Sequence, residues 1–562
     1  MSDDIKHECA VALVVLKKDG EHYRVKYGAS DYGGVKLSLL LEKQHNRGQD
    51  GAGAAIIEAN PEAGTAPYHV FKSASATPLA DVLGMITKRE EKEKSEKIFL
   101  GHLRYATFGK NDEAFCHPFA HEASDLSHTL LLAGNFNLTN AAELFDDYRH
   151  HGAFPTSKAD GYLITELIAH ELANGQSLDA ALARALKDAD GAWTLVGSTA
   201  DGTAFATRDP HGIRPGWYYA DDEVVVVASE RPAIQAAFDV PPEDVKELPP
   251  GSALIVSPEG DVRFESQTSS PAPRPCAFER IYFSRANDAD IHRERKALGA
   301  ALLPQILAAA NAPLEDVFFS YIPNSARIAF HGLLERLFEE HGKIRFGEIA
   351  VKDAKFRTFI ADAAARREFY KHVYDVTYGL VGEDDTLVVL DDSIVRGNTM
   401  KNAILPMLSR LGPRRIVIVS SAPPIRYPDC YGIDMSTLGE LVAFRALVNL
   451  LGDDANEILR EALAGDSQNP LAALYARFTD EQHNAEIARL LTPSGIDSEV
   501  AVVYQTVGNL RRCLNFSELG NQDDKLAVGD WYFTGDYPTP GGYKVLRKAI
   551  LNYLNKNSER SY

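Results

Sequence analysis

Two adjacent carboxylates, Asp391 and Asp392, directly follow an apolar stretch at residues 387–390. The next residues, 393–399, include serine, glycine and threonine, whose backbone N–H groups and hydroxyls let an anion approach closely. Paired carboxylates beside such a loop suit a partner that carries hydroxyls and a cation, such as a ribose with Mg²⁺. The chemistry that this stretch predicts is the binding of a phosphorylated sugar. The simpler alternative is a turn between a strand and a helix, capped by acidic residues.

A strand and a helix must hold this loop in place. Residues 387–390 are too few for a helix and predict a short buried strand. The apolar spacing of residues 403–411 predicts a helix, in which Pro406 predicts a kink. With the next strand expected at residues 415–419, this is a strand–helix–strand unit. Ligands of such sheets lie at the carboxyl ends of the strands, which is where the two aspartates stand.

Residues 387–400 as a whole resemble the phosphoribosyl pyrophosphate (PRPP) motif of type I phosphoribosyltransferases. The resemblance implies that the two aspartates hold ribose hydroxyls and metal-bound water, and that the loop after them holds the 5-phosphate. The PRPP-binding residues that it implies here are Asp391, Asp392, Ser393, Arg396, Gly397, Asn398 and Thr399.

Composition narrows the class of protein. A chain of 562 residues predicts more than one domain, and a net charge of −20 argues against nucleic acid or an anionic membrane surface as a partner. The five cysteines are scattered and form no CxxC pair, which argues against a disulfide framework and favours the cytoplasm. No apolar run reaches the ~18 residues of a membrane span, and the polar N-terminus is not a secretory signal.

Cys9 stands at the start of an apolar stretch that predicts a strand. Four polar segments later in the chain belong with it: residues 44–50, 101–107, 134–140 and 208–215. Together they resemble the glutaminase domain of N-terminal-nucleophile amidotransferases. In that family the peptide before the cysteine is removed, so loss of residues 1–8 would free an α-amino group, with a pKa near 8, to act as base for the thiol. The alternative is a small buried apolar residue.

The same resemblance implies roles for other side chains and a fold. Arg104 would bind the α-carboxylate of glutamine with its guanidinium fork, and Asp160 would hold the α-amino group. Asn135 and the N–H of Phe136 would form the oxyanion hole for the reaction at Cys9. The fold that the family implies for this part of the chain is an αββα sandwich.

Three residues depart from the family pattern. Phe136 stands where the family has glycine, so a backbone N–H is retained but a glycine-only conformation is not. Asn46 is an extra residue in the first polar segment, and Tyr162 replaces an acidic residue after Asp160. The alternative that these departures leave open is a domain that keeps the fold and has lost hydrolysis.

Residues 267–275 contain three prolines and three hydroxyl side chains and predict a linker between two domains. The expected fold class is therefore α+β followed by α/β: an N-terminal-nucleophile sandwich, then a type I phosphoribosyltransferase domain with a parallel sheet. The expected divisions are a propeptide at 1–8, a type 2 glutamine amidotransferase domain at 9–266, a phosphoribosyltransferase domain at 276–530 with a helical insertion at about 445–491, and a C-terminal segment at 531–562.

The second half resembles amidophosphoribosyltransferases, and the resemblance implies further site residues. Ser325 matches a serine on the metal side of the PRPP site. Arg357 and Arg367 match arginines of a loop that closes over PRPP, although Tyr374 replaces a lysine of that loop. A metal site at Ser325 with the paired aspartates implies Mg²⁺ as the cofactor.

Cys276 and Cys430 match two of the four cysteines that hold an iron–sulfur cluster in some members of this family. Gly529 and Tyr532 stand at the other two positions. Because such clusters need thiolate ligands, we expect no cluster and buried apolar roles for both cysteines.

The order of these motifs implies an enzyme that transfers ammonia from glutamine to C1 of PRPP, giving 5-phosphoribosylamine, pyrophosphate and glutamate, the first step of de novo purine synthesis. The family also implies purine nucleotide inhibitors and a homo-oligomer, a tetramer or a dimer. One alternative is a paralogue with a degenerate glutaminase, which uses free ammonia or senses PRPP or nucleotides. Another is a sugar-phosphate amidotransferase or asparagine synthetase, against which the paired aspartates count.

Overall fold

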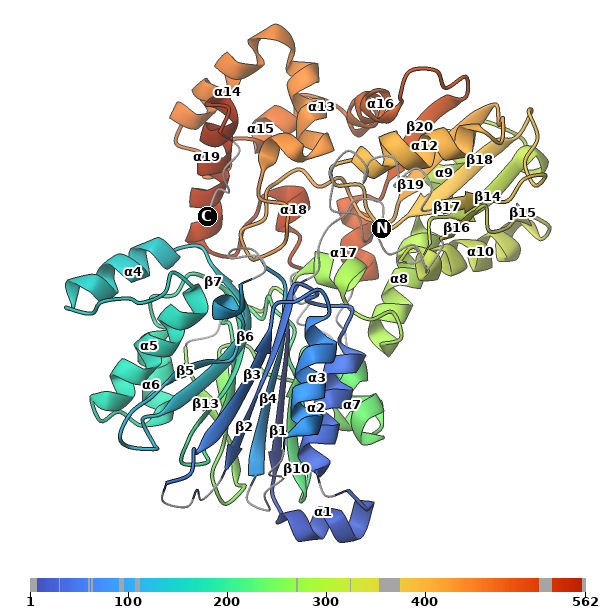
Figure 1. The fold of residues 1–562 in the computed structure, drawn as a ribbon. Coiled ribbons are helices and arrows are strands. Elements are labelled where there is room, and N and C mark those ends of the chain that lie inside the picture. Colours follow the sequence, from blue (N-terminus) through green and yellow to red (C-terminus); the bar gives the residue numbers. More distant parts are fainter. Residues whose placement is uncertain are drawn as a thin grey trace.

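Two groups of elements follow one another along the chain (Figure 1). The structure is a computed structural model, and it describes residues 8–557 except 30, 59–60, 62–63, 90–95, 107–111, 269–270, 324, 353–373 and 515–527. The elements up to residue 266 form two antiparallel sheets with helices outside them, and those from residue 279 onward surround a parallel sheet. Within the described residues, no helix is long and apolar enough to cross a membrane.

The first sheet has seven strands, and each is antiparallel to its neighbours. In spatial order they are β11 (Lys246–Glu247), β9 (Trp217–Ala220), β10 (Val224–Ala228), β1 (Ala10–Leu16), β4 (Glu96–Arg104), β2 (Gly51–Glu58) and β3 (Tyr68–Ser73). Strand β1 is central, so the chain leaves Cys9 directly into the middle of the sheet. This position fixes Cys9 at the sheet's end, between the neighbours β10 and β4.

The second sheet has six strands and packs face to face on the first. In spatial order they are β13 (Val262–Ser266), β12 (Ser252–Val256), β8 (Ala204–Arg208), β7 (Gly191–Thr199), β6 (Leu130–Leu138) and β5 (Phe119–His121). Alternating residues such as Val11 and Leu13 of β1 and Leu131 and Ala133 of β6 fill the space between the sheets. Strand β6 continues through Asn135 and Phe136, so most of the polar segment at 134–140 is part of a strand.

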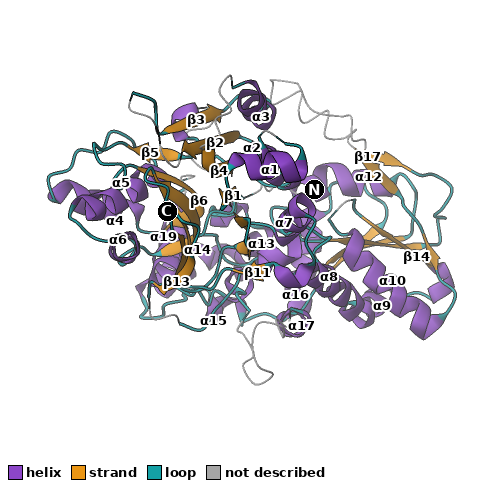
Figure 2. Cartoon of the chain, turned by 90° about the horizontal axis from the view of Figure 1, so that it is seen from below, coloured by secondary structure: helices purple, strands orange, loops and turns teal. Residues whose placement is uncertain are grey.

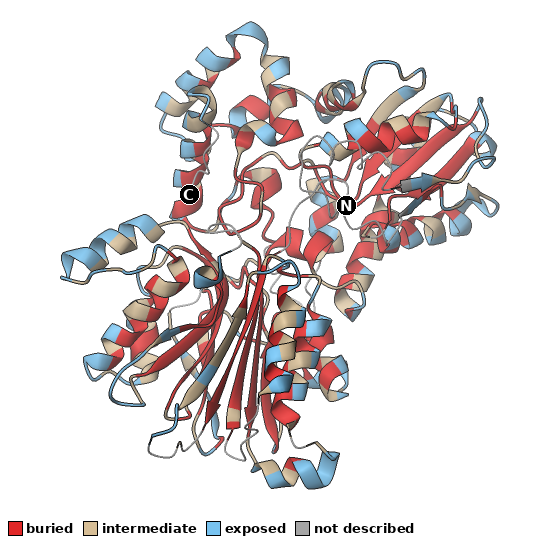
Figure 3. Cartoon of the chain, in the orientation of Figure 1, coloured by how far each residue is buried: buried red, intermediate tan, exposed pale blue. Residues whose placement is uncertain are grey.

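Helices cover the outer faces of both sheets (Figure 2). Helices α1 (Gly20–Tyr27), α2 (Tyr32–Lys43), α3 (Pro78–Lys88) and α7 (Arg231–Phe238) belong to the side of the first sheet. Helices α4 (Ala141–His150), α5 (Asp160–Ala173) and α6 (Leu178–Ala185) belong to the side of the second. Most strands are buried along their length, with strands such as β3, β9 and β13 partly exposed, whereas the outer faces of the helices are exposed (Figure 3). The predicted αββα sandwich is thus confirmed.

The two groups of elements are called the first unit, up to residue 266, and the second unit, from residue 279 onward. The second unit contains one sheet of five parallel strands. In spatial order they are β15 (Arg345–Phe346), β14 (Val317–Tyr321), β18 (Thr386–Asp391), β19 (Arg415–Ser420) and β20 (Glu499–Tyr504). Val388 and Leu390 of β18 face a cluster with α9 (Leu303–Ala310) and α10 (Arg327–His341). Leu387 and Val389 face the opposite cluster, with α12 (Leu405–Ser409) and α16 (Asp480–Leu491). A parallel sheet covered on both faces confirms the predicted α/β class.

The helix expected after the paired aspartates is interrupted, as Pro406 predicts. A π-helical turn, Met400–Ile404, precedes α12, and Pro406 lies in the first turn of α12, where its missing N–H does no harm. Smaller elements complete the unit: the π-helical turn Glu279–Phe283, α8 (Ala289–Ala301), β16 (Ala350–Lys352), β17 (Tyr374–Val376) and α17 (Val507–Cys513).

The helix-rich segment at 445–491 packs against its own chain. It contains most of α13 (Val442–Leu451), then α14 (Ala455–Ala464) and α15 (Ala472–Tyr475), and ends with α16. Leu447, Leu459 and Leu474 share a core with Leu546 and Ile550 of α19 (Pro540–Leu554). Helix α16 instead contacts β20 and serves as the crossover before that strand. The segment therefore has two different structural roles, a distinction that its amphipathic pattern does not reveal.

Candidate functional site

The five residues that the sequence assigns to glutamine chemistry lie around one cavity of about 420 Å³. They are Cys9, Arg104, Asn135, Phe136 and Asp160. Cys9 precedes β1, Arg104 ends β4, Asn135 and Phe136 belong to β6, and Asp160 begins α5. Because these elements come from both sheets and the helix layer, the sandwich must be complete before the cavity exists.

Cys9 lies in a setting that keeps its thiol protonated. The N–H of Tyr105 donates to Cys9 Sγ at 3.3 Å. Burial raises the pKa of the Cys9 thiol to about 11, although the Tyr105 backbone and the charge of Arg104 act in the opposite direction. A thiol of this kind needs a base before it can act as a nucleophile.

Asn135 offers a buried hydrogen-bond donor to this cavity. The residue is 2% exposed, and its Nδ2 finds no acceptor among the described parts of the chain. A buried amide donor without a partner costs free energy, so its position calls for an explanation, and a catalytic role is one that fits a cavity lined by a cysteine. An oxyanion beside Cys9 would satisfy it.

Arg104 and Asp160 supply opposite charges to the same cavity. Arg104 is buried, with its guanidinium 5.9 Å from the centre of the Phe115 ring. Asp160 accepts a hydrogen bond from the N–H of Gly161 at 3.0 Å. Burial raises the pKa of Asp160 to about 6, with the Gly161 N–H and the Arg104 charge as smaller opposing causes. A cavity with one fixed cation and one carboxylate suits a zwitterion such as an amino acid.

The three departures from the family pattern are accommodated in different ways. The ring of Phe136 lies edge-on to His117, with ring centres 5.8 Å apart. The hydroxyl of Tyr162 accepts from the N–H of Thr156 at 3.4 Å. Asn46 reaches the second unit, where its amide donates to the carbonyl of Phe283 at 3.3 Å. None of the three blocks the cavity with a charged group.

The paired aspartates lie at the carboxyl end of β18, as the sequence predicts. Both are 1% exposed. The N–H of Ser421 donates to the Asp391 carbonyl at 2.9 Å, and that of Ala422 to the Asp392 carbonyl at 3.0 Å, so the chain after β19 braces the turn. Burial raises the pKa of Asp392, and hydrogen bonds from Ser325 and Ser393 partly offset this. The structure thus brings Ser325 to the carboxylates, as the resemblance implies.

A buried cation lies near these carboxylates. Arg295 of α8 is 4% exposed and donates to the carbonyls of Arg280 and Ser284, at 2.9 and 2.7 Å. Burial lowers the pKa of Arg295 to about 10, while Asp392 and Glu230 act to raise it. The pKa of Arg295 is therefore affected by a carboxylate of each unit. The sequence does not mark Arg295 as a site residue.

The residues of the loop after Asp392 differ in how far they are exposed to solvent. Ser393 is buried, Asn398 is exposed and Thr399 is half-buried. Gly397 has φ +75°, and an added Cβ would meet Leu491 at 2.3 Å, so glycine is required there. The guanidinium of Arg396 is turned to acidic neighbours, donating to Glu440 at 2.7 Å and lying 3.2 Å from Asp434.

Two predicted residues, Arg357 and Arg367, lie outside the described residues, as does most of the predicted closing loop. The described residues at this site, the paired carboxylates, suit Mg²⁺ as oxygen ligands. Among the described residues, no group of three or more His, Cys, Asp or Glu forms a metal site of its own. Mg²⁺ commonly uses one or two carboxylates and takes its remaining ligands from water and substrate phosphates, which matches Asp391 and Asp392.

The positions of the family's cluster cysteines do come together here, but their residues do not fit a cluster. Cys276 and Cys430 are both buried in the core of the second unit, as expected. Cys276 forms a backbone bridge with Gly529, where an added Cβ would lie 2.2 Å from the Trp531 ring. The hydroxyl of Tyr532 donates to Asp429 at 2.5 Å. Two thiols are too few, and aromatic rings fill the space.

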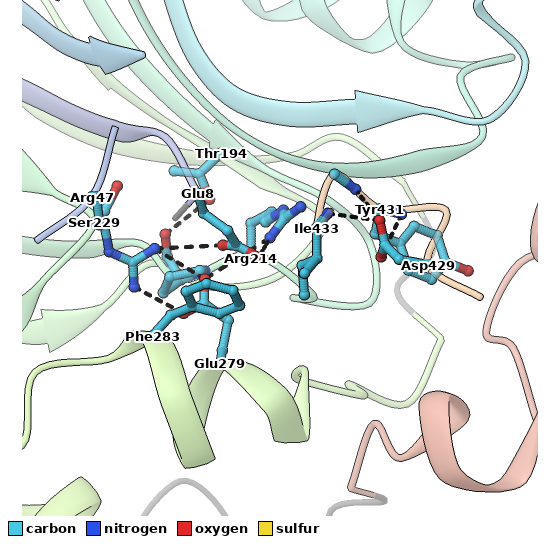
Figure 4. A network of polar contacts seen from close by, with 12 residues as sticks. Glu8, Arg47, Thr194, Arg214, Ser229, Glu279, Phe283, Asp429, Tyr431 and Ile433 are labelled. Carbon is cyan, nitrogen blue, oxygen red and sulfur yellow. Dashed lines mark hydrogen bonds and ion pairs between the residues drawn. The ribbon is translucent and has the colours of Figure 1, made fainter. Parts of the chain in front are cut away.

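The sequence also missed the contacts between the two units. Arg214 and Gly432 line the cavity with Cys9, although Gly432 belongs to the second unit. Buried between the units lies an ion cluster that includes Glu8, Arg47, Arg214 and Glu279 (Figure 4). Glu230 belongs to the same cluster through its ion pair with Arg47. Arg47 and Arg214 occur in polar segments that the sequence marks out, but nothing in the sequence indicates that they are buried.

Known proteins agree with this arrangement. A sequence model described as a glutamine amidotransferase domain matches residues 116–236. The amidophosphoribosyltransferase of Mycobacterium bovis is 28% identical over 521 residues, covering 87% of this chain and 90% of that protein. That of Escherichia coli K12 is 29% identical over 515 residues, covering 87% and 93%. The glutamine PRPP amidotransferase of B. subtilis, solved with ADP and GMP, superposes with a TM-score of 0.67 at 26% identity, covering 94% and 97%.

An antiparallel sandwich with a cysteine-lined cavity is joined here to a parallel sheet with paired aspartates, and part of the sandwich matches a glutamine amidotransferase domain. The similarity extends through both units and in the same order. Over most of its length, the chain is similar to amidophosphoribosyltransferases.

Proposed function

We propose that this protein transfers the amide nitrogen of glutamine to C1 of PRPP, giving 5-phosphoribosylamine, pyrophosphate and glutamate, and so begins de novo purine synthesis. The observation that carries the proposal is the grouping of Cys9, Arg104, Asn135 and Asp160 around one cavity, in a chain that also buries Asp391 and Asp392 at the end of a parallel strand. The names of the relatives support both halves of the reaction.

In the first half, removal of residues 1–8 frees the α-amino group of Cys9, which takes the thiol proton. The thiolate attacks the glutamine amide, ammonia leaves, and water hydrolyses the thioester. Arg104 binds the α-carboxylate, Asp160 binds the α-amino group, and Asn135 Nδ2 stabilises the oxyanion together with the Phe136 N–H. The raised pKa of the Cys9 thiol explains why a base so close to it is needed.

In the second half, ammonia displaces pyrophosphate at C1 of PRPP. Asp391 and Asp392 orient the ribose hydroxyls and, with Ser325 beside them, would hold Mg²⁺ when it is bound, and the loop from Ser393 to Thr399 holds the 5-phosphate. When bound, Mg²⁺ would neutralise charge on the departing pyrophosphate. Arg357 and Arg367 are proposed to close over the substrate. Purine nucleotides as inhibitors, and a homo-oligomer, are further proposals, the former supported by the nucleotides bound to the B. subtilis protein.

A coupled assay tests the proposal directly. Purified protein is given PRPP and Mg²⁺ with either glutamine or an ammonium salt, and release of pyrophosphate is followed together with formation of glutamate. We expect both nitrogen sources to support pyrophosphate release, and glutamate to appear only with glutamine. If neither nitrogen source supports pyrophosphate release, the proposed function is refuted. If ammonium alone supports it, only the degenerate-glutaminase alternative is left.

Lowering the pH is expected to weaken glutamine binding through Asp160. The pKa of this carboxyl is raised to about 6, so the charged form that holds an α-amino group is lost as pH falls through that value. We expect KM for glutamine to rise below pH 6, approaching about tenfold per pH unit. KM for PRPP in the ammonium reaction, measured over the same range, is the control. A glutamine KM that stays constant down to pH 5 would contradict the role of Asp160.

Replacing Asp392 by asparagine is expected to reduce transfer with both nitrogen sources. The variant loses the negative charge that orients ribose and metal-bound water, and we expect kcat to fall about 10²-fold or more. Asp384→Asn makes the same change at an exposed position before the same strand and should leave both rates unchanged. Equal rates in the two variants would show that the paired aspartates do not bind the substrate. Glutamate release without PRPP serves as a measure of correct folding.

A further inference from the structure

Glu8, the residue before the proposed nucleophile, is buried at the contact between the two units (Figure 4). Its side chain is 1% exposed. A carboxylate this deeply buried needs compensating partners, and it has two arginines, Arg47 and Arg214, which are themselves 0% and 2% exposed as side chains. Glu8, which the proposed processing removes, is thus as buried as a core residue and is paired with two arginines.

Both polar groups of Glu8 are held by residues of the first unit. Its carboxylate forms an ion pair with Arg214 and lies 3.5 Å from Nη1 of Arg47. Its backbone carbonyl, which belongs to the Glu8–Cys9 peptide bond, accepts a hydrogen bond from the N–H of Gly48 at 2.8 Å. Arg47 and Gly48 are consecutive, so one turn grips the side chain and the scissile carbonyl at once.

The backbone of Gly48 is shaped for this contact. Its φ is +42°, and an added Cβ would meet the carbonyl oxygen of Leu103 at 2.3 Å. Only glycine tolerates both the conformation and the close approach. The turn itself is anchored from the other side, because Arg47 donates to Glu230 at 2.7 Å and to Glu279 at 2.8 and 3.0 Å. The Gly48 N–H, which is the hydrogen-bond donor, is therefore held in place before any reaction.

We propose that Arg47, Gly48 and Arg214 form a clamp that positions the Glu8–Cys9 peptide bond for self-cleavage, with the Gly48 N–H as the oxyanion donor of that reaction. This site differs from the oxyanion hole at Asn135, which serves glutamine. The inference deepens the proposed function, on which it rests, because a mature N-terminal Cys9 is what glutamine hydrolysis requires. Arg47 and Arg214 are positioning residues, whereas Gly48 contacts the reacting carbonyl.

The chemistry balances with water as the sole co-reactant. Cys9 Sγ forms a bond to the carbonyl carbon of Glu8 and the C–N bond breaks, so the thiol proton finishes on the departing nitrogen of Cys9. Water then hydrolyses the thioester, which restores the thiol and leaves residues 1–8 with a C-terminal carboxylate. The Gly48 N–H stabilises the negative charge that builds on the carbonyl oxygen in both steps.

Cleavage also changes the charge balance of the cluster. Before cleavage, two arginines face three carboxylates, those of Glu8, Glu230 and Glu279. Departure of Glu8 leaves two of each sign, and Glu279 Oε1 is already 3.9 Å from Arg214 Nη1. The ion cluster therefore holds one carboxylate in excess while Glu8 is present, and departure of the Glu8 side chain balances its side-chain charges.

The substitution Glu8→Gln gives a sharp test, because the cleaved product of this variant is chemically identical to that of the wild-type chain. Full-length protein is produced by cell-free translation, and loss of residues 1–8 is followed by intact mass over time. We expect Glu8→Gln to be cleaved about tenfold more slowly or worse, since a neutral amide replaces a charge-assisted pair. Glu8→Asp keeps the charge and should fall between. Glu457→Gln, the same change on the exposed face of α14, should be cleaved as the wild type is.

A double-variant cycle checks that the arginine acts through Glu8. Arg214→Met and Glu8→Gln should each slow cleavage, and the double variant should be no slower than the worse single variant. Additive slowing would mean that Arg214 acts by another route and would overturn its place in the clamp. Once cleaved, Glu8→Gln protein must show the wild-type glutaminase rate per cleaved molecule.

The outcomes separate this inference from the proposed function. Cleavage of Glu8→Gln at the wild-type rate, or no cleavage of the wild-type chain, would overturn the clamp. The ammonium-dependent release of pyrophosphate tests the proposed function independently, because it requires neither Cys9 nor cleavage. It also reports folding: a slowly cleaved variant with full ammonium-dependent activity has lost processing and not its structure.

Discussion

Replacing Cys9 by alanine is expected to abolish glutamine-dependent release of pyrophosphate and to leave the ammonium-dependent reaction intact. The thiol is the proposed nucleophile, and it lines the cavity together with Arg104, Asn135 and Asp160, whereas none of the other described cysteines lines that cavity. We expect the glutamine-dependent rate to fall at least about 10³-fold, since loss of a nucleophile removes the covalent route entirely. Coupled assays with each nitrogen source measure the two rates in the same preparation.

The control must allow for processing, because a chain without the Cys9 thiol cannot cleave itself and keeps Glu8. Producing the variant behind a removable N-terminal fusion, so that the chain begins at residue 9, separates lost hydrolysis from lost maturation. Cys513→Ala is a matched change at a half-buried thiol in α17 and should retain both rates. Persistence of both activities in Cys9→Ala would show that another group is the nucleophile. Loss of both would show that Cys9 is needed for transfer itself.

Local sequence patterns predict this fold well where a single property of the residues, such as an apolar run or a missing N–H, determines the local structure. The strand before Asp391 and the break at Pro406 follow from apolar runs and from a missing N–H, and both are observed. The strand that carries Asn135 is less predictable, since its polar residues read as a turn. It stays extended because β7 pairs with it as far as Leu138, a partner that is distant in sequence.

The candidate site shows the same division. Cys9, Arg104 and Asp160 are recognised because each has a chemistry that the family pattern requires, and the structure brings them to one cavity. Arg214 and Gly432 line that cavity as well, but they arrive through the packing of the second unit on the first. No periodicity or composition encodes such a contact. A long charged side chain is usually exposed, so burial of Arg47 and Arg214 contradicts the expectation from sequence.

The burial of these arginines explains how the two units are joined. Arg47 comes from the turn after α2, and Glu279 from the π-helical turn that opens the second unit. Burial by itself disfavours the cation, but Glu230 and Glu279 outweigh it and raise the pKa of Arg47 above its ordinary value. The carboxylates of Asp392 and Glu230 both act to raise the pKa of the buried Arg295, against the larger lowering by burial.

Replacing Arg47 by methionine is therefore expected to destabilise the protein more than any surface change. The variant leaves Glu230 and Glu279 buried without their cation, a loss that typically costs about 3–5 kcal/mol of unfolding free energy. Denaturant unfolding, followed by tryptophan fluorescence and by circular dichroism, should show an earlier midpoint. Arg24→Met removes an ion pair on the surface of α1, with side chains 61% and 49% exposed, and should leave the midpoint unchanged.

A rescue experiment distinguishes unpaired charge from lost packing. If the cost arises from the two stranded carboxylates, the triple variant Arg47→Met, Glu230→Gln, Glu279→Gln should unfold at a higher denaturant concentration than Arg47→Met alone, since neutral amides are cheaper to bury than carboxylates. If the cost arises from the space that the arginine filled, the added substitutions will not restore stability. An Arg47→Met midpoint equal to that of Arg24→Met would show that the buried cluster does not hold the two units together.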